Sequence, residues 1–156
     1  TWIDYTVLCT GGEIPDYMLD SELFLYQILK PGKDGHCINI SSWFITASTN
    51  NKILLLVRDL LYEYWKSNST LIEYYLFHTF FNIACEVYPD DWNKVIKFSN
   101  SIPHILLLSL FEKFDQNKYK IIKQMTCFHK LSYKHSDEQI SKANTYYDFI
   151  INKGKY

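Results

Sequence analysis

The first β-strand is predicted by an alternating run near the amino end, Trp2-Ile3-Asp4-Tyr5-Thr6-Val7. Successive side chains of a strand point to opposite faces, so Asp4 and Thr6 would share one face. Thr10-Gly11-Gly12 follows with the composition of a turn. The run therefore predicts a strand over residues 2–8 that carries a carboxylate and a hydroxyl on one side.

The remaining pattern predicts an α/β protein. The segment from Ile38 to Ala47 is rich in β-branched and aromatic residues and predicts a second strand, while residues 18–29 fit a short helix or a buried segment. Apolar residues at helical spacing predict helices over residues 52–66 (capped near Asn50), 71–88 and 115–125, and a final helix after Ser136, while residues 103–111 fit either a helix or an irregular apolar segment. Residues 126–133 are expected to be extended. We expect a few strands packed by several helices in one domain, residues 1–156.

Charge and hydropathy exclude two classes of partner. The 156 residues carry 16 Lys and Arg against 17 Asp and Glu, a formal net charge of −1. This balance offers no basic surface for a nucleic acid. The longest aliphatic stretches, 53–57 and 105–108, are far shorter than the ~20 residues of a membrane-spanning helix. We therefore expect no nucleic-acid partner and no transmembrane segment.

Acidic side chains supply the first candidates for chemistry. Asp4 and Thr6 are oxygen ligands that suit a hard divalent cation bridging to phosphate. The alternative is that Asp4 is simply a carboxylate at the end of a strand. A glycoside hydrolase, which needs a pair of carboxylates, is a further alternative because the sequence contains Asp90-Asp91 and Asp137-Glu138. Both pairs, however, have the position of helix caps.

Four blocks of sequence carry a resemblance to a known family. The blocks are Trp2-Ile3-Asp4-Tyr5-Thr6-Val7, Ser41-Ser42-Trp43-Phe44-Ile45, Glu73-Tyr74-Tyr75-Leu76-Phe77-His78 and His129-Lys130-Leu131-Ser132-Tyr133-Lys134. In this order they resemble the capsular polysaccharide synthesis family of bacterial glycosyltransferases. That family is similar to retaining GT-A enzymes related to initiation mannosyltransferases, whose Asp-x-Asp signature here reads Asp4-Tyr5-Thr6.

The resemblance implies a reaction and a donor site. A sugar would pass from a nucleotide-diphosphate donor to a growing capsular or surface polysaccharide, with retention of configuration and assistance from a metal ion. Asp4 would be catalytic and would hold the metal or the donor, and Thr6 would add a neutral ligand. His129 would return to the metal and favour Mn²⁺ over Mg²⁺. Because Thr6 replaces a second carboxylate, metal affinity should be weaker.

Other residues in the blocks would contact the substrates. Lys130 or Lys134 would pair with the diphosphate. Ser41 and Ser42, with Asn39 on the strand face of Ser41, would bond to the donor, whereas Trp43 is expected in the core. Glu73 and His78 are the candidates for the acceptor side. Glu73 stands where the family block is expected to have Asp, which argues against a catalytic carboxylate there. A single histidine such as His78 on an apolar helix is usually packed in the core.

The chain opens at Thr1 without an initiator Met or a signal peptide, as if cut from a longer protein. We expect the C-terminal part of a GT-A-like nucleotide-diphospho-sugar transferase, with N-terminal nucleotide-binding units missing and little activity of its own. The expected location is cytoplasmic, including the inner face of the membrane, and an exposed sheet edge could pair two copies. The competing hypothesis is a non-catalytic binding or assembly module whose aromatic residues form a partner surface.

Overall fold

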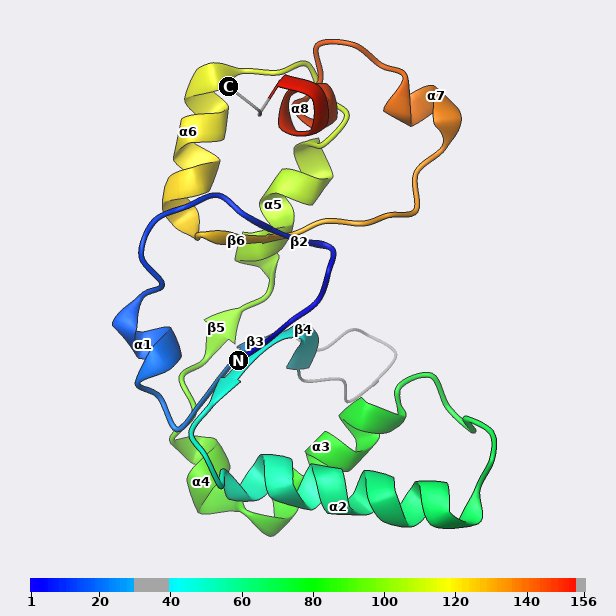
Figure 1. Cartoon of the computed structure of the whole chain (residues 1–156). Coiled ribbons are helices and arrows are strands. Elements are labelled where there is room, and N and C mark those ends of the chain that lie inside the picture. The colour runs from blue at the N-terminus through cyan, green and yellow to red at the C-terminus, as the bar shows by residue number, and fades with distance from the viewer. Residues whose placement is uncertain (30–39, 154–156) are drawn as a thin grey trace. The chain divides into compact units, whose positions relative to one another are not determined.

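The computed structural model describes residues 1–29 and 40–153, which group into two compact units (Figure 1). Unit 1 comprises Thr1–Ile3 and Ile14–Asn100, and unit 2 comprises Asp4–Glu13 and Ser101–Tyr156. Asn39, one of the predicted donor-binding residues, lies outside the described residues. The prediction of a single domain stays a prediction.

Unit 1 contains a mixed four-stranded sheet with the order β1-β4-β3-β5. The strands are β1 (Trp2–Ile3), β3 (Leu23–Gln27), β4 (Ile40–Ala47) and β5 (Phe98–Ser99). β4 is antiparallel to β1 and β3, whereas β5 is parallel to β3. All five residues of β3 are buried, because this interior strand is covered on both faces. The predicted buried segment within residues 18–29 is therefore a strand, preceded by the short helix α1 (Asp16–Leu19).

Helices cover one face of this sheet and aromatic rings the other. The helices are α2 (Lys52–Ser67), α3 (Leu76–Val87) and α4 (Pro89–Asn93), of which α2 and α3 lie side by side (Figure 1). Leu23 and Leu25 of β3 join the aliphatic core with α2 and α3. Phe24 and Tyr26 point the opposite way, where they contact the rings of Phe44 and Phe98.

Polar side chains and turns determine the residues at which α2 and α3 begin. The side chain of Asn51 accepts a hydrogen bond from the Leu54 N–H at 3.2 Å, so it caps α2 one residue after the predicted Asn50. The predicted start of the next helix at residue 71 is wrong, because residues 71–75 are exposed and form a turn. In that turn the carbonyl of Glu73 accepts the N–H of Leu76.

Unit 2 contains a two-stranded antiparallel ladder between β2 (Val7–Cys9) and β6 (Phe128–Lys130). Its helices are α5 (Ser101–Ser109), α6 (Gln116–Met125), α7 (Asp137–Ile140) and α8 (Tyr146–Asp148), followed by a π-helical turn, Phe149–Lys153. One cluster of buried residues in this unit consists of Leu106, Tyr119, Ile122 and Tyr146.

Two predicted elements are wrong for local reasons. The strand predicted over residues 2–8 is interrupted, because residues 4–7 form a turn that separates β1 from β2. The final helix is also interrupted: Asn144 has a φ of 59°, and its carbonyl accepts the N–H of Phe114. Ala143, predicted on the apolar face of that helix, is exposed.

The α/β class is confirmed, since the protein has a mixed sheet and several helices. Both edge strands of the sheet in unit 1, β1 and β5, have two residues each and offer little backbone to a second copy. Pairing of two chains through a sheet edge stays a prediction. Among the described residues, Cys9, Cys85 and Cys127 are free thiols.

Candidate functional site

The turn between β1 and β2 is built around the side chain of Asp4. The Asp4 carbonyl accepts the N–H of Val7 at 3.1 Å. Its carboxylate oxygen Oδ1 accepts two further hydrogen bonds, from the Thr6 N–H at 2.8 Å and the Thr6 hydroxyl at 2.7 Å. An aspartate that bonds to its own backbone two residues on is a common way to fix a turn. The carboxylate is therefore held in one orientation.

Lys130 completes the arrangement from the opposite strand. It pairs with Val7 in the ladder, which carries its side chain to the turn. Its Nζ lies 3.4 Å from Asp4 Oδ1 and donates a hydrogen bond to the Thr6 hydroxyl. The side chains of Lys130 and Asp4 are 19% and 32% exposed. We call Asp4, Thr6 and Lys130 the Asp4–Lys130 cluster.

The cluster keeps its carboxylate ionised. Partial burial by itself would raise the pKa of Asp4, but the two hydrogen bonds from Thr6 and the positive charge of Lys130 outweigh it. The pKa of Asp4 is consequently lower than its usual value of 3.8. The cluster is an ion pair whose ammonium group remains partly accessible to solvent.

His129 lies on the other side of the ladder. Neighbouring residues of a strand point in opposite directions, so Lys130 reaches Asp4 while His129 points away from it. The imidazole is fully buried, and its Nε2 lies 3.3 Å from the hydroxyl of Thr10. Burial lowers the pKa of His129 to about 4. A hydrogen bond with the backbone of Thr126 raises this pKa by a smaller amount. The structure therefore does not bring the two expected metal ligands together.

The donor set at Asp4 does not fit a divalent metal ion. The carboxylate already faces an ammonium group, and a second cation beside it would be repelled. Among residues 1–29 and 40–153 there is no group of three or more His, Cys, Asp and Glu side chains that could hold a metal ion. Lys130 is 19% exposed, so its ammonium can still donate a hydrogen bond to a phosphate group that approaches from solvent.

Two exposed tyrosines, which the sequence reasoning missed, flank the cluster. Tyr5 lies in the turn between Asp4 and Thr6, and its ring centroid is 5.9 Å from that of Tyr133. The predicted Lys134 belongs to this group, since its Nζ lies 5.7 Å from the centre of the Tyr133 ring. The only signal available in the sequence was the position of each tyrosine inside a block that carried a candidate residue.

The predicted sugar-binding serines belong to unit 1, whereas the cluster belongs to unit 2. Ser41 is buried, and its hydroxyl accepts a hydrogen bond from the Asn100 side chain at 3.3 Å. The carbonyl of Ser42 accepts a hydrogen bond from the Trp2 indole. Trp43 is buried and stacks on Tyr26 with ring centroids 4.7 Å apart, so its expected place in the core is confirmed.

The possible acceptor-side residues, Glu73 and His78, surround the start of α3 in unit 1. The Glu73 carboxylate accepts the N–H of Tyr75 at 3.0 Å, which supports the turn before the helix. His78 is half-buried between the rings of Tyr75 and Phe77. Burial lowers the pKa of His78, so the ring is neutral near pH 7. Both residues have structural contacts that account for them.

The family model described as capsular polysaccharide synthesis protein matches residues 1–150. The chain belongs to this family. The resemblance carried by the four sequence blocks is thus confirmed for the family, and the name implies a role in capsular polysaccharide synthesis. Neither the curated proteins nor the solved structures contain a match to the chain. Within the described part of this family member, every helix is too short or too polar to cross a membrane.

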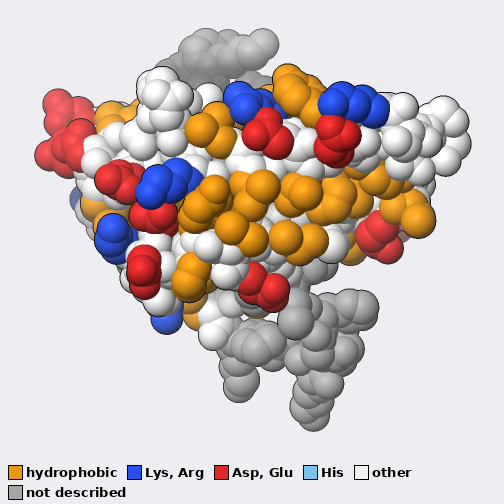
Figure 2. Space-filling view, turned by 90° about the horizontal axis from the view of Figure 1, so that it is seen from below, with side chains coloured by type: hydrophobic (Ala, Val, Ile, Leu, Met, Phe, Trp, Pro, Cys, Tyr) orange, Lys and Arg blue, Asp and Glu red, His pale blue; other side chains and the backbone are white. Residues whose placement is uncertain are grey.

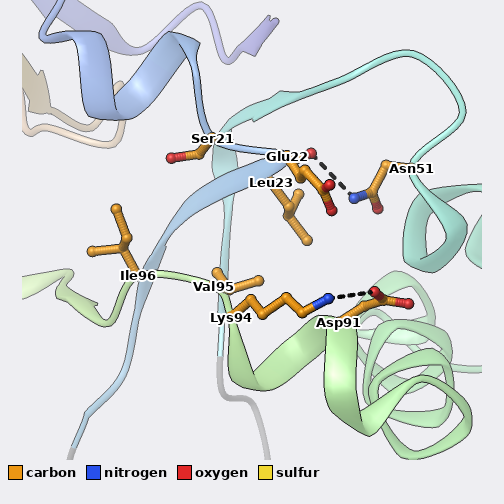
Figure 3. A pocket seen from close by; sticks show the side chains of 8 residues that line it. All are labelled: Ser21, Glu22, Leu23, Asn51, Asp91, Lys94, Val95 and Ile96. Carbon is orange, nitrogen blue, oxygen red and sulfur yellow. Dashed lines mark hydrogen bonds and ion pairs between the residues drawn. The ribbon is translucent and has the colours of Figure 1, made fainter.

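This member of the capsular polysaccharide synthesis family also has a pocket in unit 1 (Figure 3). It has a volume of about 230 Å³ and is lined by Ser21, Glu22, Leu23, Asn51, Asp91, Lys94, Val95 and Ile96.

The carboxylate of Asp91 is shared by two lysines, Lys52 and Lys94, each at 3.6 Å. Asp90 and Asp91 lie in the first turn of α4, but the prediction that this pair caps the helix is wrong, because Tyr88 is the N-cap residue and no side chain caps the helix. We assign no hydrolase role to this pair.

A second surface of unit 1 is apolar. Figure 2 shows hydrophobic side chains gathered on the face where α2 and α3 lie, with charged side chains along its margins. The exposed large hydrophobic residues on these two helices are Tyr62, Trp65, Ile83 and Val87. Their exposure means that the apolar stripe of each helix is wider than the sheet and the partner helix can cover.

Proposed function

We propose that this protein acts as a glycosyltransferase that moves a sugar from a nucleotide-diphosphate donor to a growing capsular or surface polysaccharide. Membership of the capsular polysaccharide synthesis family supports the biosynthetic role. The single observation that supports a donor site is the Asp4–Lys130 cluster, a fixed and partly accessible ammonium group. A GT-A-like architecture and retention of configuration belong to the proposal through the resemblance of the sequence blocks. A nucleotide-sugar donor would place the activity in the cytoplasm or at the inner face of the membrane.

Lys130 would act on the leaving group. An acceptor hydroxyl forms the new bond to the anomeric carbon, while the bond from that carbon to the diphosphate oxygen breaks. The bonding electron pair stays on the phosphate, and the hydroxyl proton passes to solvent or to the released diphosphate. Negative charge therefore develops where a preorganised cation stabilises it most. Asp4 and Thr6 hold the Lys130 ammonium in place, and no step is assigned to a metal ion.

Thermal denaturation with a panel of UDP- and GDP-sugars tests the donor site. Binding to the folded state alone raises its stability by about 2.7 kcal/mol when the ligand is at about 100 times its Kd. We expect a higher melting temperature with at least one donor, with or without Mn²⁺. Lys130→Met should abolish this increase, because the variant lacks the ammonium group.

Lys120→Met is the matched control, because Lys120 is an exposed lysine on α6 of the same unit. It should retain the full increase with the same donor. The measurement is made on the 156-residue chain and on the product of its whole open reading frame. No increase with any donor in either form, or an undiminished increase in Lys130→Met, would contradict the proposal.

The second candidate is a non-catalytic assembly module, which the apolar face on α2 and α3 favours. In that case two copies of the chain would bury this face against each other. Sedimentation velocity should then show a dimer in the wild type and a monomer in Ile83→Glu, with no donor-dependent increase in melting temperature. A wild type that is monomeric at every concentration speaks against the module.

A further inference from the structure

The rings of Tyr5 and Tyr133 form an exposed surface beside the Asp4–Lys130 cluster. Tyr5 is 80% exposed and Tyr133 is 65% exposed. Their centroids are 5.9 Å apart and their planes are inclined by 33°. Two large rings so exposed normally reduce their contact with water by packing, and here they contact each other without being buried.

The backbone holds both rings in place. Tyr5 lies in the turn that the hydrogen bonds to Asp4 close. The Thr6 carbonyl accepts the N–H of Leu131, which ties this turn to the segment carrying Tyr133. The hydroxyl of Ser132 accepts the N–H of Lys134 at 3.0 Å. A surface already ordered in this way loses less conformational entropy when a ligand binds.

Another exposed pair in the same chain shows what is particular to this geometry. Tyr74 is 81% exposed and contacts Tyr75, with the rings inclined by 89°. In a perpendicular pair the edge of one ring meets the face of the other, so the two do not present neighbouring faces. Two rings can face one flat ligand from the same side only when their planes are close to parallel, and those of Tyr5 and Tyr133 are inclined by 33°.

The surroundings of the platform favour a carbohydrate. Lys134 lies over the Tyr133 ring, and the Asp4–Lys130 cluster adjoins Tyr5, so polar groups border the aromatic surface. A pyranose ring has an apolar face of C–H groups and a rim of hydroxyls, which matches an aromatic surface with a polar border. Loss of solvation, with the nearby Tyr133 and Asp4, raises the pKa of Tyr5, so its hydroxyl stays protonated and can donate a hydrogen bond.

We propose that Tyr5 and Tyr133 form a glycan-binding platform that stacks against a pyranose ring of the acceptor polysaccharide. This inference rests on the proposed function, because it places the acceptor beside the group that would stabilise the leaving diphosphate. Lys134 would contact the hydroxyls or an acidic substituent of the same sugar. Together we call Tyr5, Tyr133 and Lys134 the platform.

Affinity electrophoresis tests the platform directly. The wild type is run in native gels cast with dextran, mannan, β-glucan or hyaluronan, and at least one polysaccharide should retard it. Tyr5→Ala and Tyr133→Ala should each weaken this retardation roughly threefold to tenfold, in line with the energy of one aromatic contact. Tyr5→Phe should keep most of it, because the ring remains.

The controls separate this proposal from the donor site. Tyr74→Ala removes a tyrosine that is as exposed as Tyr5 and should leave retardation unchanged. Lys130→Met should lose the donor-dependent rise in melting temperature but keep glycan binding, and Tyr5→Ala should do the reverse. Retardation by none of the four polysaccharides overturns the platform. Loss of donor binding in Tyr5→Ala also overturns it, since the rings would then contact the nucleotide.

Discussion

At the scale of single residues, the identity of Thr6 accounts for the chemistry of the cluster. Its hydroxyl donates to Asp4 and accepts from Lys130, which a second carboxylate at this position could not do. Another negative charge there would repel Asp4 and favour a bound cation instead. In this structure the Asp4 carboxylate is therefore paired with the ammonium group of Lys130.

One prediction at the scale of single residues concerns pH. Burial lowers the pKa of His129 to about 4, from an ordinary 6.5. Between these values the unfolded chain binds a proton that the folded chain does not, so the free energy of unfolding should fall as the pH drops from 6.5 towards 4. The full contribution of such a shift is about 3 kcal/mol. Urea denaturation at a series of pH values measures it.

His129→Gln should flatten this pH dependence, because glutamine does not titrate. His78→Gln should remove a smaller part, since burial also lowers the pKa of the half-buried His78. Comparison above pH 7 separates the loss of packing from the loss of titration, because both imidazoles are neutral there. An identical slope in the wild type and His129→Gln would show that His129 is accessible to protons in the folded state.

At the scale of elements, α2 shows how one side chain places a helix. The Asn51 side chain accepts from Leu54 and donates to the carbonyl of Glu22, so it joins the helix to the start of β3. The preceding Asn50 has a φ of 67°, which turns the chain into the helix. The two neighbouring asparagines therefore have different roles.

This difference predicts different responses to substitution. Asn51→Ala should lower the free energy of unfolding by about 1 kcal/mol, because the first turn of α2 loses its cap. Asn50→Gly should change it by less than about 0.5 kcal/mol, since glycine adopts a positive φ without strain. Guanidinium denaturation of both variants gives the comparison. Equal effects would mean that the cap of α2 is not the Asn51 side chain.

At the scale of the whole molecule, the chain passes between the two units three times. The passages follow Ile3, Glu13 and Asn100, so neither unit is a continuous segment. Interleaved connections favour cooperative unfolding, because opening one unit releases the ends of the other. This is the physical basis for expecting a single domain.

Two buried isoleucines, one in each unit, test whether the chain unfolds as a single domain. Ile53 on α2 and Ile122 on α6 are both buried, one in the core of each unit. Replacing either with alanine should lower stability by roughly 2–5 kcal/mol. In calorimetry both variants should shift one common transition, whereas Ile72→Ala, which is largely exposed, should leave it nearly unchanged. Two separate transitions, each sensitive to one variant, would show two independent domains.

Part of the fold and of the site could be predicted from the sequence. The helix over residues 52–66 agrees with α2 within a residue, because its apolar positions repeat every turn. Asp4, Thr6 and Lys130 were all named as candidates. Tyr5 and Tyr133 were missed, since exposure of an aromatic ring depends on distant parts of the chain. The strand predicted over residues 2–8 failed because side-chain hydrogen bonds at Asp4 outweigh alternation.

The sequence by itself determined the α/β class, the long helices and membership of the capsular polysaccharide synthesis family. These depend on patterns within a few neighbouring residues or on blocks read in order. Only the tertiary structure decided that Lys130, and not His129, faces Asp4. Lys130 and Thr6 are 124 positions apart, and the register of β2 against β6 sets which side chain points to the turn. A shift of one residue would reverse the two, and no local pattern encodes that register.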